Sequence, residues 1–217
     1  MPSKQKIISI NKKEEIANAI THGLGLILAI IGVGVFFNLF QMGTNEAPFW
    51  GAVIFSFALI ITFLASTVYH LVWNLSYRRI FRIIDHICIY LLIAGTNTPF
   101  VLLYLDNNWG TAYLVVLWSL VLLGIILKIF LIGKYNLLDA MYYLFLGWMG
   151  VILVPVLMQG MTLFSISMIG LGGLSYSIGV YFYLKDDRSY FHAIWHLFVI
   201  GGSACHYIAL LSAFDII

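Results

Sequence analysis

Seven long apolar stretches constrain the fold of this chain more than any other feature of its sequence. Each is about 20 residues long, the length at which an α-helix spans the hydrocarbon core of a bilayer. A segment inside that core must satisfy its own backbone hydrogen bonds, which a helix does. The stretches cover residues 18–40, 48–72, 83–105, 109–132, 137–158, 161–184 and 190–213. We therefore predict an all-α integral membrane protein, a bundle of seven transmembrane helices.

The composition excludes an ordinary soluble domain. Of the 217 residues, 62% are hydrophobic and only 9% are charged, whereas a soluble domain carries about 25% charged residues. The formal net charge of +2 gives no indication of a nucleic-acid partner. The length fits a single seven-helix membrane domain over residues 1–217, with residues 1–15 as a cytoplasmic segment before the first helix.

The basic residues predict the orientation of the bundle. They lie before the first stretch, between the second and third, at the end of the fourth, and between the sixth and seventh: Lys4, Lys6, Lys12, Lys13, Arg78, Arg79, Arg82, Lys128, Lys134, Lys185 and Arg188. In a chain that crosses the membrane seven times, all of these positions belong to the same side. Because basic loops stay in the cytoplasm, we predict a multi-pass protein of the cell membrane with its N-terminus inside and its C-terminus outside.

Ionisable side chains inside the spans are the first candidates for function, because they are costly in a membrane. The predicted topology places His70, Asp85, His192 and His196 at the level where the N-terminus lies, together with His22 and His86. These residues come from four different helices. His206 differs, because it lies about 15 Å deeper along its helix than His196.

His192 and His196 form an H-x-x-x-H pattern one helical turn apart, so both imidazoles could bind one metal ion. Taken alone, the pair fits equally well with two histidines that hydrogen-bond to neighbouring groups. His70 at the same level would complete the three neutral ligands of a catalytic Zn²⁺ site, and Asp85 could take a proton from water there. Ser66 lies one turn before His70. Its hydroxyl could bind the water or the substrate, or else bond its own backbone.

Four short motifs carry a resemblance to a known family. They are Glu15, Asn18, Thr21 and His22 in the pattern E-x-x-N-x-x-T-H; Ser66 and His70 in S-x-x-x-H; Asp85 followed by Leu91, Leu92, Ile93, Gly95 and Pro99; and the pair His192 and His196. The chain resembles the hemolysin III branch of the progestin and adipoQ receptor family, in a superfamily that also contains alkaline ceramidases.

The resemblance implies zinc held by His70, His192 and His196, with Asp85 holding the water on the zinc. It also implies hydrolysis of a lipid amide. We therefore expect a zinc-dependent hydrolase of a membrane lipid, an amide or an ester, acting in membrane lipid homeostasis. Asp85 would be the general base and Ser66 would help to place the oxyanion. Two alternatives stay open: a pore-forming cytolysin, and a lipid or fluidity sensor whose zinc is structural. The sequence leaves open the oligomeric state and the roles of His22, His86 and His206.

Overall fold

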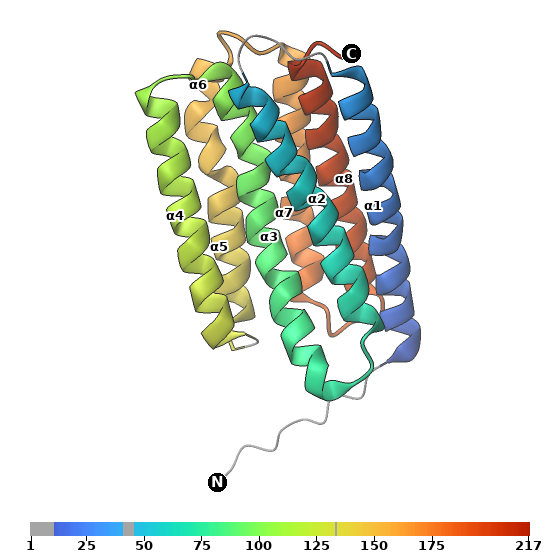
Figure 1. The fold of residues 1–217 in the computed structure, drawn as a ribbon. Helices are drawn as coiled ribbons and strands as arrows, with labels where there is room; N and C mark the ends of the chain where they lie inside the picture. The colour runs from blue at the N-terminus through green and yellow to red at the C-terminus, as the bar shows by residue number, and fades with distance from the viewer. Residues whose placement is uncertain (1–10, 41–45, 133) are drawn as a thin grey trace.

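The computed structural model describes residues 11–40, 46–132 and 134–217, and over these ranges the chain forms helices and turns without strands (Figure 1). The helices are α1 (Lys12–Leu39), α2 (Ala47–Leu71), α3 (Leu75–Tyr104), α4 (Asn108–Leu131), α5 (Asn136–Trp148), the 3-10 helix η1 (Met149–Leu153), α6 (Val154–Leu157), α7 (Leu163–Leu184) and α8 (Phe191–Ala213). Because α5, η1 and α6 together form one span, the described residues contain seven helical segments long and apolar enough to cross a membrane. The predicted seven-helix bundle is confirmed.

Two helices begin earlier than the hydropathy pattern predicts. The prediction starts the first helix at residue 18 and leaves residues 73–82 as a connection, but α1 begins at Lys12 and α3 at Leu75. Each start is capped by an asparagine side chain. Asn11 accepts a hydrogen bond from the backbone of Lys13, and Asn74 accepts one from the backbone of Ser76. A side-chain cap stabilises a polar first turn of a helix as well as an apolar one. Hydropathy therefore marks where a segment becomes apolar, and the helix itself can begin earlier.

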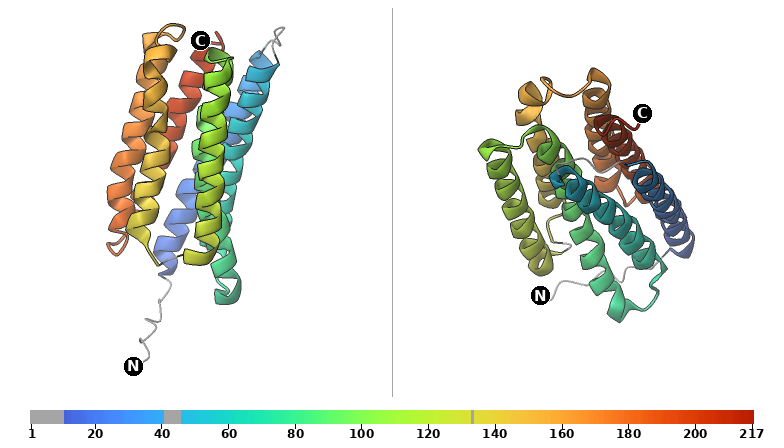
Figure 2. Two further views of the ribbon diagram at one scale, coloured as in Figure 1. Left: turned by 90° about the vertical axis from the view of Figure 1, so that its left-hand side faces the viewer. Right: turned by 45° about the horizontal axis from the view of Figure 1, so that its top comes forward.

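The helices stand side by side in one bundle, with their connections at its two ends (Figure 2). Helix α2 packs along α3 and α1, and α7 packs along α8, which also contacts α1. Glycines allow the close approach of α2 and α3. A Cβ atom on Gly51 would lie 2.7 Å from the Cα atom of Pro99, and one on Gly95 would lie 2.8 Å from the Cβ atom of Ala58. Small residues at such contacts are typical of helix packing in membranes.

One end of the bundle carries the basic residues, and we call it the basic end. It holds the starts of α1, α3 and α8 and the ends of α2, α4 and α7, whereas the C-terminus lies at the opposite end (Figure 1). The predicted clustering of positive charge therefore extends to every basic residue in the described ranges; Lys4 and Lys6 lie outside them. That the basic end faces the cytoplasm stays a prediction.

The fifth span is interrupted. Pro99 in the third span and Pro155 in the fifth predict a kink in each, and the structure places a 3-10 turn at Met149–Leu153 just before Pro155, which then occupies the start of α6. A proline lacks the backbone N–H that a continuing helix requires, and the first turn of a new helix tolerates this loss. Helix α3, by contrast, continues through Pro99 without a break.

Candidate metal centre

Three histidines meet at the basic end of the bundle. His70 lies in the last turn of α2, and His192 and His196 lie in the first turns of α8. One ring nitrogen from each lies within 4.8 Å of the other two, which is close enough for a shared metal ion. His70 is 2% exposed and His196 is fully buried. The predicted convergence of these three side chains is therefore present in the structure.

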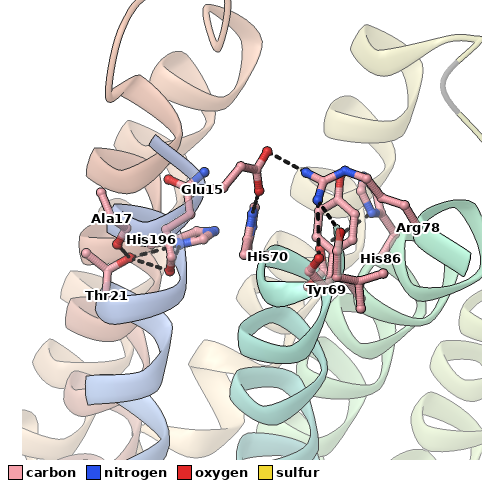
Figure 3. A network of polar contacts seen from close by, with 11 residues as sticks. Glu15, Ala17, Thr21, Tyr69, His70, Arg78, His86 and His196 are labelled. Carbon is pink, nitrogen blue, oxygen red and sulfur yellow. Dashed lines mark hydrogen bonds and ion pairs between the residues drawn. The ribbon is translucent and has the colours of Figure 1, made fainter. Parts of the chain in front are cut away.

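The ring of His70 is oriented by Glu15 of α1, as Figure 3 shows. Its Nδ1 atom lies 2.7 Å from the Oε2 atom of Glu15, whose other oxygen forms an ion pair with Arg78 of α3. A carboxylate can only accept a hydrogen bond, so Nδ1 carries the proton. The Nε2 atom of His70 then keeps its lone pair. A histidine whose second nitrogen donates to a carboxylate is the usual arrangement in metal sites.

The ring of His196 is oriented by α1 in a similar way. Its Nδ1 atom lies 3.2 Å from the carbonyl oxygen of Asn18 and 3.0 Å from the hydroxyl of Thr21. That hydroxyl lies within donating distance of the carbonyl oxygens of Ala17 and Asn18. The Nδ1 atom is therefore the donor, and the lone pair of His196 is again on Nε2.

The free nitrogens fit a metal ion. The Nε2 atoms of His70, His192 and His196 are all buried, and none has a hydrogen-bond partner among the described residues. Buried polar atoms in native proteins almost always have a partner, so three unpaired imidazole nitrogens in one cluster require an explanation. Neutral imidazoles with free lone pairs are the ligands that Zn²⁺ binds, and one ion would satisfy all three.

His22 packs directly against this cluster. Its ring stacks on that of His196 with a centroid separation of 3.5 Å and an angle of 16° between the planes. Neither ring nitrogen of His22 has a hydrogen-bond partner in the part of the chain that the structure describes. The ring of His22 therefore covers one face of the His196 ring, and it also lines the cavity described below.

Ser66 and Asp85, the predicted catalytic pair, are both buried at this end. The hydroxyl of Ser66 makes no hydrogen bond to its own helix, and it lies beside the carboxylate of Asp85. Asp85 of α3 is 4% exposed and lies outside the group of possible metal ligands. Its Oδ2 atom is 3.7 Å from the Nδ1 atom of His86, which is also 2.8 Å from the carbonyl oxygen of Arg82. The ring of His86 is thus held by its own helix rather than by the cluster.

A cavity of about 280 Å³ begins at His22 and Asp85 and extends between the helices toward the far end of the bundle. Its walls are mostly aliphatic and aromatic side chains of α3, α5, α7 and α8, and residues of η1 and α6 also contribute. A Cβ atom on Gly147 or Gly170, two of the lining residues, would meet nothing within 4 Å. The lining is mainly apolar, and at the basic end it includes His22, whose ring stacks on that of His196.

The structure assigns positions to residues whose contribution the sequence does not reveal. Glu15, Asn18 and Thr21 carry the resemblance as motif letters, and the contacts show that they orient His70 and His196. Their spacing contains a usable signal. Residues at i, i+3 and i+7 share one face of a helix, so Glu15, Asn18 and His22 had to point the same way. The contribution of Arg78 has no such signal, because it arises only from the packing of α3 near α1.

The chain is similar to known proteins over most of its length. A family model described as "Haemolysin-III related" matches residues 10–207. A "Hemolysin-3 homolog" of Bacillus subtilis is 42% identical over 92% of this chain and 93% of its own length, and "Hemolysin-3" of Bacillus cereus is 38% identical over 92% and 91%. The human "Monocyte to macrophage differentiation factor" is 30% identical over 91% of this chain and 83% of its own.

With seven membrane-spanning segments and bacterial relatives that match over nearly their whole length, the protein is a multi-pass protein of the cell membrane. The family match, the curated relatives and the four motifs on α1, α2, α3 and α8 all lead to the same conclusion. This chain belongs to the hemolysin III family.

Proposed function

We propose that this protein is a zinc-dependent hydrolase that cleaves an amide or ester bond of a membrane lipid. One observation carries the proposal: three buried imidazole nitrogens without partners lie beside His22, which borders an apolar cavity together with Asp85. His70, His192 and His196 would hold the zinc ion. When bound, zinc polarises a carbonyl group and makes water more acidic.

The protein's own residues divide the remaining work. Asp85 would accept a proton from the attacking water as the water oxygen bonds to the carbonyl carbon. It would return that proton to the leaving nitrogen or oxygen as the C–N or C–O bond breaks. The hydroxyl of Ser66, which lies beside Asp85, would donate a hydrogen bond to the carbonyl oxygen as negative charge develops there. Glu15, Asn18 and Thr21 would keep the histidine rings in place.

The cavity indicates the class of substrate. Its lining residues belong to membrane-spanning helices and are mainly apolar. Such a space would take an acyl chain or a similar hydrocarbon, because moving apolar surface out of contact with water is favourable. The cleavable bond would then lie where the chain meets Asp85 and the histidine cluster.

Metal analysis and product release on one preparation test the proposal. We expect about one zinc ion per chain, with the open fourth position of a catalytic site, and release of fatty acid from at least one member of a panel of lipid amides and esters. His192→Ala combined with His196→Ala should abolish both. His86→Gln is the matched control, because His86 is a buried histidine at the same end that lies outside the cluster. Full zinc in the double variant would refute the site.

The names of the two Bacillus relatives suggest a second measurement on the same preparation. Vesicles loaded with a fluorescent dye would report leakage. Leakage without product release would favour a cytolysin, and zinc binding with neither activity would favour a sensor whose zinc is structural.

A further inference from the structure

His206 lies in the wall of the cavity, far from the histidine cluster. Ten residues separate it from His196 along α8, a rise of about 15 Å. It is 7% exposed and contacts α7. No residue of the proposed catalytic machinery touches it, so the chemistry at the basic end does not explain why an imidazole is buried here.

The hydrogen bonds of His206 leave one nitrogen unpaired. Its Nε2 atom lies 3.1 Å from the carbonyl oxygen of Ile169. Because a carbonyl oxygen can only accept, Nε2 carries the proton and Nδ1 is an acceptor. The Nδ1 atom is buried without a partner among the residues that the structure describes. Leaving a buried acceptor unpaired is unfavourable, so this position calls for a donor.

The surroundings of His206 are shaped to hold polar side chains. The Tyr176 ring, which also lines the cavity, lies 5.5 Å from that of His206, and its hydroxyl is 3.0 Å from the hydroxyl of Ser203. Both rings rest against glycines. A Cβ atom on Gly172 would lie 2.6 Å from the Nε2 atom of His206, and one on Gly202 would lie 2.6 Å from the ring of Tyr176. Larger residues at these two positions would displace both rings.

We infer that His206, with the Tyr176–Ser203 pair beside it, forms a second polar site in the cavity that binds a hydroxyl group on the hydrocarbon chain of the lipid. The free acceptor requires a donor from the ligand, which a hydroxyl supplies and a plain alkyl chain does not. The site selects lipids whose hydroxyl lies about 15 Å along the chain from the group at the histidine cluster. This inference rests on the proposed lipid occupancy of the cavity, and it does not require hydrolysis.

Binding of octadecanoic acid and of its positional hydroxy isomers tests the inference. The probes displace a fluorescent fatty acid from the full-length protein in nanodiscs, so the readout is independent of turnover. We expect the isomers whose hydroxyl reaches His206 to bind about tenfold more tightly than octadecanoic acid, the equivalent of one good hydrogen bond. Isomers with the hydroxyl nearer the carboxylate should show no such gain.

Variants locate the effect. His206→Phe should abolish the preference for the hydroxyl, while His206→Gln, which keeps an acceptor, should retain part of it. Ile166→Val is the matched control, because it trims another lining residue without changing polarity and should affect all probes equally. If no isomer binds wild-type protein more tightly than octadecanoic acid, or if no fatty acid binds at all, the inference is wrong. A preference for the hydroxyl in a protein that hydrolyses no lipid would keep this site and reject the proposed function.

Discussion

The hydrogen bonds at the Nδ1 atoms decide which nitrogen two of the clustered histidines present to one another. Glu15 accepts a hydrogen bond from the Nδ1 atom of His70, and the carbonyl of Asn18 and the hydroxyl of Thr21 accept one from the Nδ1 atom of His196. Both donors point away from the cluster and both lone pairs point into it. Helix α1 therefore orients the proposed metal ligands on α2 and α8 through Glu15, Asn18 and Thr21, but these residues supply no ligand atom themselves.

Replacing Glu15 tests this orienting role. Glu15→Gln can still accept a hydrogen bond from His70, but it loses the charge that polarises the ring and pairs with Arg78. We expect zinc affinity to fall about 10–100-fold, the usual weight of such partners. Competition with a chelating dye measures it. Glu14→Gln is the control, because Glu14 lies in the same turn and bonds Asn11 instead. Equal affinity in the two variants would contradict the role.

Asp85 should matter for turnover more than for metal retention. Asp85→Asn keeps the size of the side chain and one acceptor oxygen but loses the proton-accepting carboxylate. Zinc content should be unchanged, while lipid hydrolysis should fall by about 10²-fold or more. Zinc content and product release are measured on the same sample. Unchanged product release would reduce Asp85 to a structural residue, and loss of zinc would instead make it a ligand.

At the scale of elements, a buried ion pair joins α4 to α5 at the basic end. Lys128, 1% exposed, lies 2.5 Å from the carboxylate of Asp139. Helix α4 otherwise lies at the edge of the bundle, where its Gly124 admits the rings of Tyr90 and Tyr142. The pair is thus a main polar link between the fourth span and the interrupted fifth span, which borders the cavity.

Removing one partner should cost more than removing both. Lys128→Met leaves the carboxylate of Asp139 without its cation. A fully buried uncompensated charge costs about 3–5 kcal/mol, and because Asp139 is 17% exposed we expect a smaller loss. The double variant with Asp139→Leu should recover most of that loss, because no charge is left behind. Unfolding of the detergent-solubilised protein gives both values. A double variant as unstable as the single one would indicate that packing, rather than charge, is what the lysine supplies.

At the scale of the whole molecule, the distribution of positive charge predicts the orientation. A reporter that is active only in the cytoplasm should work when fused before Met1 and fail when fused after Ile217. A second reporter that is active only outside the cytoplasm is the control, and it should give the reverse result. If both termini report the same side, the number of spans is wrong.

Three features follow from the sequence alone: the number of spans, their approximate limits, and the end of the bundle that carries His70, His192 and His196. Hydropathy depends only on the residues of each segment, so the spans can be found one by one. Because successive spans cross the membrane in opposite directions, the position of a residue along its helix gives its depth in the membrane. Contacts between helices far apart in the sequence depend on how the helices pack. The orientation of His70 by Glu15 and the stacking of His22 on His196 are therefore visible in the folded structure and not in the sequence. The cavity, and the unpaired nitrogen of His206 in its wall, also arise from helix packing, so no pattern along the chain predicts them.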